Sequence, residues 1–238
     1  MFGSFQIASI AGIPIRVHVL FVVLVAGLAL VPDAGFLQLA ILAMLVVSVV
    51  LHELGHALVA RRFGIRVVDI TLWPLGGLAR LSSIPESSGV EAAIAIAGPL
   101  VNLFLALAAA PVVVAGFFLG AREAWVGEAA FAFVAVNVLM AGFNLLPAFP
   151  TDGGRLVRAW FARSRSWLDA TVLAVRVGRA MALLLAVTGV VWGQWMLPVV
   201  ALWLWWTGGL ELTQVRARAA AARLEGLGAR APDPAVRA

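Results

Sequence analysis

Six long apolar stretches dominate this sequence and limit the folds that it can adopt. Hydrophobic residues make up 63% of the 238 residues and charged residues only 12%, whereas soluble domains have roughly 45–50% and 25%. So few charges cannot cover a water-facing surface, and a helix that crosses a bilayer needs about 20 apolar residues. The sequence therefore predicts an all-α polytopic membrane protein with about six transmembrane helices, near residues 17–31, 36–60, 90–119, 128–146, 179–191 and 196–212. For the fifth segment, a start several residues earlier stays open.

All 17 basic residues are arginines, and their distribution predicts the orientation of the helices. If both termini are cytosolic, nearly all arginines fall in cytosolic segments, and only Arg122 falls in an outer one. Basic residues concentrate on the cytosolic side of membrane proteins, so we expect a multi-pass protein of the cell membrane with both termini in the cytosol. This distribution also accounts for the net charge of +5, and no nucleic-acid partner is expected. The absence of cysteine excludes a secreted disulfide scaffold.

Three stretches do not fit a spanning helix. Residues 66–81 (RVVDITLWPLGGLARL) contain two strand-like runs around a turn, which predicts a small cytosolic β-hairpin between the second and third helices. Residues 144–154 (NLLPAFPTDGG) contain prolines and paired glycines that interrupt a helix, and a short helix is expected near residues 153–163. We expect a core at residues 1–214 and an Arg/Ala-rich cytosolic tail at 215–238, a frayed helix followed by disorder.

The second apolar stretch contains HELGH at residues 52–56, an H-E-x-x-H pattern. On a helix, residues i and i+4 share a face, so the imidazoles of His52 and His56 can reach one metal ion while Glu53 lies beside it. The alternative is a pair of histidines on an ordinary buried helix face. Their position, about 7–14 Å from Arg61 along the helix, favours a metal, because ionisable groups at that depth in a bilayer are costly and usually functional.

A catalytic zinc site takes three protein ligands and a water molecule, and several residues are candidates for the third ligand. His18 begins the first apolar segment, where an interfacial role is the simpler interpretation. Glu86 and Glu91 fall in a surface connection before the third predicted helix. Asp152 is the strongest candidate, because it follows the broken segment on the same side of the membrane as the histidines, and irregular backbone there is tolerated where it lines a site. Its alternative role is the N-cap of the short helix that follows.

Four motifs taken together resemble the site-2 protease family of intramembrane zinc metalloproteases. The resemblance covers most of residues 13–158. It is to the simpler six-helix microbial branch of that family, and neither a PDZ-like insert nor C-terminal regulatory modules are expected. The motifs are HELGH, PLGGLARL at residues 74–81, AGPLVN at residues 97–102 and NLLPAFPTDGG at residues 144–154.

The resemblance implies a site and a cofactor. One zinc ion per chain would be held by His52, His56 and Asp152, with Glu53 as the catalytic residue. The sequence departs from the family's usual N-x-x-P-x-P-x-x-D-G spacing at Phe149, which stands where the second proline is expected, with a proline directly after it. The aspartate and the glycine keep their places in the pattern.

Three asparagines in the apolar segments are further candidates. Asn102 follows Gly98 by four residues and either lies in a close helix contact or hydrogen-bonds the substrate or an oxyanion, and both roles stay open. Asn144 is expected to hold free backbone groups of the broken segment, with substrate binding as its second role. Asn137 is assigned only to hydrogen bonding between helices.

These features predict a zinc metalloendopeptidase that hydrolyses peptide bonds within or near transmembrane helices. Expected partners are membrane-spanning protein substrates and the lipid bilayer, and a regulatory membrane protein or a second copy of the chain stays open. The hairpin at residues 66–81 would either pair its edge with an unwound substrate or cover the metal. Alternative functions are a membrane-anchored zinc protease that cuts soluble chains and, with less support in the outer half of the sequence, a metal transporter. An inactive scaffold would not need the complete metal-binding pattern.

Overall fold

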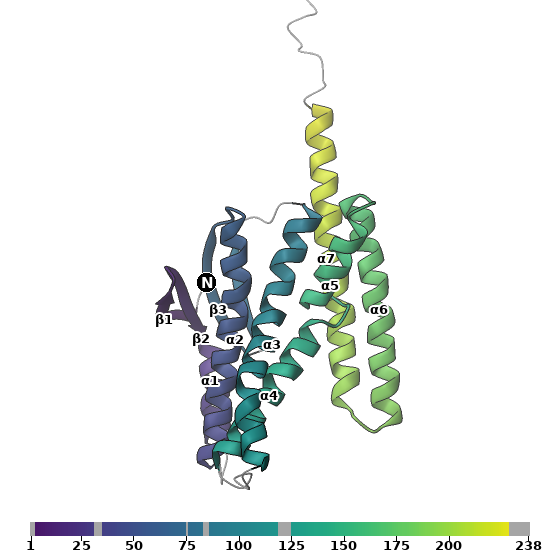
Figure 1. Cartoon of the computed structure of the whole chain (residues 1–238). Coiled ribbons are helices and arrows are strands. Elements are labelled where there is room, and N and C mark those ends of the chain that lie inside the picture. Colours follow the sequence, from purple (N-terminus) through teal and green to yellow (C-terminus); the bar gives the residue numbers. More distant parts are fainter. Residues whose placement is uncertain (1–2, 31–34, 75, 83–85, 119–124, 229–238) are drawn as a thin grey trace, which may run out of the picture. The chain divides into compact units, whose positions relative to one another are not determined.

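The computed structural model describes residues 3–30, 35–74, 76–82, 86–118 and 125–228. The chain divides into two compact units, Met1–Leu145 and Leu146–Ala238. Within the described residues, the first unit contains a small sheet and four helices, and the second contains three helices (Figure 1). The predicted fold class, a polytopic helical protein with a small sheet, is confirmed.

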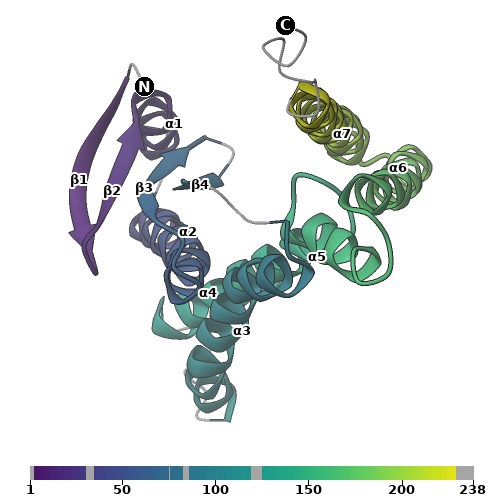
Figure 2. The ribbon, with the colours of Figure 1, turned by 90° about the horizontal axis from the view of Figure 1, so that it is seen from above.

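The sheet of the first unit is built from strands that lie on both sides of the first two helices in the sequence. β1 (Ser4–Ile10) and β2 (Ile13–His18) form an antiparallel pair before α1 (Val19–Ala29), and β3 (Val67–Trp73) and β4 (Gly76–Leu81) form another after α2 (Phe36–Arg62). β2 and β3 are parallel, so the strand order is β1-β2-β3-β4 (Figure 2). The hairpin predicted at residues 66–81 is confirmed, although Leu75 in its turn lies outside the described residues.

The two N-terminal strands were not predicted from the sequence, and the first predicted segment, near residues 17–31, starts about two residues before the helix does. Ile13, Ile15 and Val17 are buried and alternate with more exposed residues, which is the period of two expected of a strand with one buried face. The helix begins only at Val19. With 11 residues, α1 is about 16 Å long, roughly half the thickness of the hydrocarbon core of a bilayer.

The sheet packs against α2. Ile13 and Ile15 of β2 and Ile70 of β3 form a buried cluster with Ala57, which follows the HELGH motif. Burial of such side chains contributes about 1.5–3 kcal/mol each. The cluster therefore fixes the C-terminal part of α2 to the sheet, and it sets where the side chains of the motif lie.

Helices α3 (Ser88–Phe118) and α4 (Trp125–Asn144) complete the first unit and pack on α2 and on each other. The approach of α2 to α3 is close at Gly55. A Cβ atom there would lie 2.9 Å from Val101 Cγ2 and 3.0 Å from the carbonyl oxygen of Ala97. The glycine in HELGH thus allows α3 to approach the face of α2 that carries the histidines.

Among the residues that the structure describes, four helices are long and apolar enough to cross a membrane: α2, α3, residues Val126–Asn144 of α4, and α6 (Trp167–Val191). The second, third, fourth and fifth predicted segments therefore correspond to helices that meet this criterion. The first predicted segment corresponds to the short apolar helix α1. The sixth, residues 196–212, forms the first half of α7 (Met196–Gly228).

The second unit contains α5 (Asp152–Phe161) and the paired helices α6 and α7. α6 begins 12 residues before the predicted segment 179–191, because two arginines interrupt the apolar run without interrupting the helix. The Arg179 guanidinium lies over the Trp205 ring, 4.9 Å from its centroid, which accommodates the charge beside an apolar helix. The helical part of the predicted tail continues to Gly228, and residues 229–238 lie outside the described part.

A buried carboxylate joins three strands of the sheet. Arg80 Nε on β4 donates to Asp69 Oδ1 on β3 at 2.7 Å, and Arg16 Nε on β2 lies 4.0 Å from Asp69 Oδ2. Asp69 is 3% exposed. The hydrogen bond from Arg80, together with the charges of Arg80 and Arg16, holds the pKa of Asp69 below its ordinary value against the opposing effect of burial.

We expect the substitution Asp69→Asn to loosen the sheet at neutral pH. Because the pKa of Asp69 is lowered by folding, its stabilising effect is fully present above the ordinary carboxyl pKa, near 4, and is lost as pH falls through the lower value of the folded state. Arg80 is partly exposed, so the effect is about 0.5–1 kcal/mol, or a two- to fivefold faster hydrogen exchange of β3 and β4 amides at pH 7. The difference in amide exchange rate between the variant and the native chain should shrink near pH 3. An equal difference at pH 7 and pH 3 would mean that the substitution acts through packing and not through the charge of Asp69.

Candidate metal centre

The two histidines of HELGH lie one helical turn apart on the buried face of α2. His52 is 3% exposed and His56 is 8% exposed. Their Nε2 atoms lie 3.1 Å apart, and the rings meet edge to face, with centroids 4.7 Å apart. The helix therefore brings two imidazole nitrogens to one point, as the i, i+4 spacing predicts.

The other nitrogen of each ring faces a hydrogen-bond acceptor on α3. His56 Nδ1 lies 2.6 Å from the carbonyl oxygen of Ile94, and His52 Nδ1 lies 2.5 Å from Asn102 Oδ1. A carbonyl oxygen only accepts, so Nδ1 carries the proton in each ring, and in a neutral ring Nε2 is then the nitrogen that can bind a metal ion. The two Nε2 atoms therefore converge as possible ligands of one cation.

A divalent metal ion fits this arrangement. Zinc binds imidazole nitrogens at about 2.0–2.1 Å in tetrahedral geometry, which places two such nitrogens about 3.3 Å apart. The observed 3.1 Å separation of the Nε2 atoms is close to that value. The donor set and its geometry therefore suit a zinc ion.

Gly98 on α3 provides the space in front of the two rings. A Cβ atom at this position would lie 2.3 Å from His56 Nε2 and 2.7 Å from His52 Nε2. The imidazoles are held by their Nδ1 contacts and cannot easily turn away. The glycine of the AGPLVN motif is thus required at this position because the Nε2 atoms of both histidines are directed at its backbone.

Glu53 lies beside the histidines and against the sheet. Its Oε2 accepts a hydrogen bond from the backbone N–H of Ala79 on β4 at 3.2 Å. A Cβ atom at Gly77 would lie 2.3 Å from Glu53 Cγ, so β4 passes directly over the carboxylate side chain. Gly77 lies in the predicted turn region of the hairpin, and its lack of a side chain makes room for Glu53.

Asn102 and Asn144 have different surroundings. Asn102 contacts His52 through Oδ1, and its Nδ2 donates to Asn137 Oδ1 at 2.8 Å. Asn144 Nδ2 donates to the carbonyl oxygen of Met140, one turn earlier on α4, at 3.0 Å. The interhelical hydrogen bond expected of Asn137 is present, and Asn144 holds a backbone group of its own helix.

Asp152 begins α5 in the second unit. It is 8% exposed and is the first residue of the helix, while Thr151 is the N-cap. The Thr151 hydroxyl lies 2.6 Å from the carbonyl oxygens of both Leu146 and Ala148 and stabilises the non-helical segment before α5. The alternative role of Asp152 as the N-cap is therefore wrong.

The other residues considered as the third ligand are His18, Glu86 and Glu91, and each has its own surroundings. His18 is the N-cap of α1, where its Nδ1 accepts from the backbone N–H of Leu20 at 3.2 Å, and its ring stacks on Trp73 with centroids 3.9 Å apart. Glu86 is exposed. Glu91 was expected in a surface connection, but it lies in the first turn of α3 and is 3% exposed, because this helix begins before it and buries that face.

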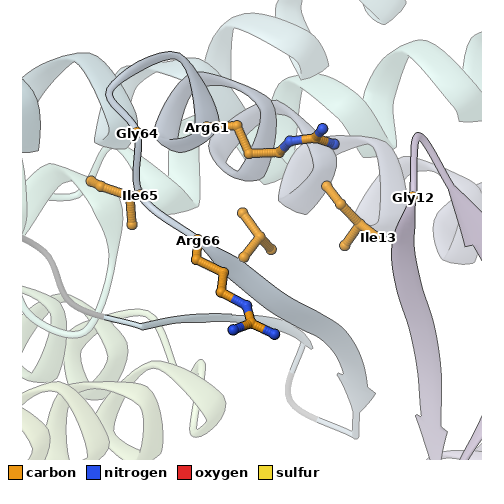
Figure 3. Close-up of a pocket in the computed structure, with 7 residues that line it drawn as sticks. Gly12, Ile13, Arg61, Gly64, Ile65 and Arg66 are labelled. Carbon is orange, nitrogen blue, oxygen red and sulfur yellow. The ribbon is translucent and has the colours of Figure 1, made fainter.

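A cavity of about 260 Å³ elsewhere in the first unit lacks the groups of a metal centre. It lies between the β1–β2 turn and the connection from α2 to β3 (Figure 3). The side chains of Arg61 and Arg66 run in different directions there (Figure 3), and Arg61 Nη1 donates to the carbonyl oxygen of Ala11 at 2.5 Å. Its lining residues are Gly12, Ile13, Arg61, Gly64, Ile65, Arg66 and Val67.

The fold and the site define a class: a helical membrane protein with an H-E-x-x-H metal centre on one of its long apolar helices. The chain belongs to peptidase family M50, whose model matches residues 40–124 and 121–185. A zinc metalloprotease of Methanocaldococcus jannaschii is 35% identical over 205 residues, which cover 85% of this chain and 58% of that protein. The putative zinc metalloprotease Rip3 of Mycobacterium tuberculosis is 42% identical over 148 residues, 61% of this chain and 37% of that protein.

A solved structure agrees with this assignment. The site-2 protease from Methanocaldococcus jannaschii matches with a TM-score of 0.61 and 32% sequence identity, over 88% of this chain and 95% of that one. The resemblance inferred from the four motifs is therefore confirmed. This chain spans between about a third and three fifths of the length of the two curated relatives named above.

We expect Gly98→Ala to weaken metal binding strongly, because the new methyl group would occupy the space in front of both Nε2 atoms. Overpacking at such a position costs about 1–3 kcal/mol, or a roughly 5- to 150-fold loss of affinity for Zn²⁺ in a competition titration with a chelator. Gly89→Ala on the same helix is the matched control, since a Cβ there meets nothing within 4 Å. Equal zinc affinity in the two variants would show that Gly98 does not face the metal.

Proposed function

We propose that this chain is a zinc-dependent endopeptidase that hydrolyses peptide bonds within or near the transmembrane helices of membrane proteins. The observation that carries the proposal is the convergence of the His52 and His56 Nε2 atoms, 3.1 Å apart, beside Glu53 on α2, a helix long and apolar enough to span a bilayer. Membership of family M50 and the zinc metalloproteases among its relatives support the same chemistry.

The proposed third ligand is Asp152. Two imidazoles and one carboxylate are a donor set used by catalytic zinc, and they leave the fourth position open for water. Asp152 offers a carboxylate oxygen and is buried, as are His52 and His56. It follows a segment whose backbone is irregular between Leu145 and Thr151, which gives the carboxylate a position that a continuous α4 helix would not provide.

The chain's own residues would carry out the proton transfers. Zinc, when bound, supplies a Lewis acid that polarises water and the peptide carbonyl. Glu53 accepts a proton from the attacking water and returns it to the leaving nitrogen. Its hydrogen bond from Ala79 holds the carboxylate beside the histidines before the substrate arrives.

The site's position on α2 suits a membrane-embedded substrate. Peptide bonds in an intact helix are shielded by their own hydrogen bonds, so the substrate must unwind locally, and residues of low helix propensity near the cut would favour this. β4 is the last strand of the described sheet and lies against Glu53. An unwound stretch that pairs with the edge of β4 would therefore lie next to the catalytic carboxylate, which favours strand pairing over a simple covering role.

The distribution of arginines and the sheet both support an orientation with a cytosolic N-terminus. Arg61 and Arg62 end α2, and basic residues are typical of the cytosolic end of a spanning helix. β2 before α1 pairs with β3 after α2, so both strands lie on the same side of the membrane. We assign residues 1–214 to the membrane-embedded core and residues 215–238 to a basic tail, and we propose that this tail lies on the cytosolic side.

Single cysteines introduced into the cysteine-free chain test this orientation. We expect Ser9→Cys and Ala219→Cys to be protected from a membrane-impermeant maleimide in intact cells and labelled after permeabilisation. Arg122→Cys should be labelled in intact cells and serves as the control for the outer side. Labelling of Ser9→Cys in intact cells would contradict the proposed orientation.

Substitutions at two of the proposed positions separate metal binding from chemistry. Glu53→Gln should keep one zinc ion per chain and lose cleavage of a membrane-spanning substrate in proteoliposomes by about 10²- to 10⁴-fold, because the general base is removed. Asp152→Ala should lose both zinc and cleavage, because a ligand is removed. Zinc content measured by mass spectrometry and cleavage measured on the same samples check both.

Other results would contradict specific parts of the proposal. Full cleavage by Glu53→Gln would exclude Glu53 as the base, and normal zinc content in Asp152→Ala would exclude Asp152 as a ligand. Efficient cleavage of casein in place of the membrane-spanning substrate would favour a protease of soluble chains. Zinc flux into vesicles without any cleavage would favour a transporter.

A further inference from the structure

A continuous line of buried polar side chains joins three helices of the first unit and ends at the metal centre. Ser48 and His52 lie on α2, Asn102 on α3 and Asn137 on α4. Ser48, Asn102 and Asn137 are fully buried, at 0% exposure. Polar groups in apolar surroundings are costly unless they are hydrogen-bonded, so a line of four such groups requires an explanation.

The hydrogen bonds along this line have only one consistent direction. Asn137 Nδ2 donates to the backbone carbonyl oxygen of Phe133 at 2.9 Å, and to Ser48 Oγ at 3.0 Å. Because a backbone carbonyl only accepts, the amide of Asn137 is fixed with its Oδ1 towards Asn102. Asn102 must therefore present Nδ2 to Asn137, at 2.8 Å, and Oδ1 to His52 Nδ1, at 2.5 Å.

We propose that Asn102 and Asn137 are positioning residues, which hold His52 with a proton on Nδ1 and its Nε2 lone pair directed at the metal. Asn102 acts on the ring directly, and Asn137 acts by fixing the orientation of the Asn102 amide. The amide oxygen of Asn102 is engaged by His52, and its Nδ2 by Asn137 and, at 3.9 Å, by Met140 Sδ. This assigns Asn102 to the imidazole in place of a substrate oxyanion.

The two histidines are held in different ways. His56 is held by the backbone carbonyl of Ile94, which is part of the α3 main chain and does not depend on any other side chain. His52 is held by the Asn102 side chain, which has a second orientation available if Asn137 is removed. The ring orientation of His52 therefore depends on α4, a helix that supplies no ligand to the metal.

Zinc affinity of the full chain in detergent micelles, measured by competition with a chelator, tests the proposal. Loss of a partner that orients a metal-binding histidine costs about 10- to 100-fold in metal affinity, and we expect Asn102→Leu and Asn137→Leu each to fall in this range. The double variant should be no weaker than Asn102→Leu alone, because both act through the same ring. Asn137→Asp, which as a neutral buried carboxylic acid can donate its O–H to the Phe133 carbonyl and still accept from Asn102 Nδ2, should keep affinity within about threefold of that of the native chain.

Ser48→Ala is the matched control. It removes a buried polar group from the same line but leaves the Phe133 carbonyl, which suffices to orient Asn137. Its zinc affinity should stay within about threefold of that of the native chain. The proposal is overturned if Asn137→Leu stays within threefold as well, if the losses of the two single variants multiply in the double variant, or if Ser48→Ala loses as much as Asn137→Leu.

A spectroscopic measurement on the native chain keeps the proposal testable if the leucine variants do not fold. The sequence has three histidines, so nitrogen NMR of the zinc-loaded chain with labelled histidine has three imidazoles to assign. We expect His52 to bind zinc through Nε2 and to show a protected Nδ1 proton. Zinc bound through Nδ1, or an Nδ1 proton that exchanges freely with water, would overturn the proposal.

The inference depends on the proposed zinc site, and the two can fail separately. A native chain that binds no zinc would contradict the proposed function. Normal zinc binding and cleavage by the native chain, together with unchanged affinity in Asn137→Leu, would contradict only the positioning role.

Discussion

The convergence of two imidazole nitrogens on one point is the constraint on which the rest of the first unit depends. His52 and His56 are held with their Nε2 atoms 3.1 Å apart on the buried face of α2. The rings keep this orientation because each Nδ1 atom has an acceptor on α3. The sheet, the glycines and the buried amides can all be understood as supports for this pair.

Two glycines and the edge strand β4 shape the surroundings of His52, His56 and Glu53. Gly98 lets the α3 backbone lie close to the imidazole rings without a side chain in front of their Nε2 atoms, and Gly77 lets β4 pass over Glu53. The cluster of Ile13, Ile15, Ile70 and Ala57 fastens the sheet to α2. Apolar packing outside the site thus determines where the Glu53 carboxylate lies relative to the histidines. Small residues are needed at Gly77 and Gly98, far apart in the sequence, because β4 and α3 both pass close to the side chains of the motif.

The sequence predicts the helical class, the β3–β4 hairpin and the histidine pair, because each depends on local spacing. It does not predict β1 and β2, since the alternating run from Ile13 to Val17 continues directly into the apolar residues of α1. It also places the start of α6 too late, because the Trp205 ring that accommodates Arg179 comes from a later helix. The role proposed for Asn137 could not be predicted either, because its partners on α2 and α3 are distant in sequence. Asp152 stays a prediction from the motif and the family.

The parallel pairing of β2 with β3 has a consequence for biosynthesis. The two strands are separated by the whole of α1 and α2, so the sheet cannot close until both helices have been inserted and the following hairpin has left the ribosome. The backbone group that supports Glu53 belongs to that hairpin. A partly synthesised chain that already contains both histidines therefore still lacks the backbone support of Glu53, and if Glu53 is the proposed base, hydrolysis has to wait until translation has passed β4.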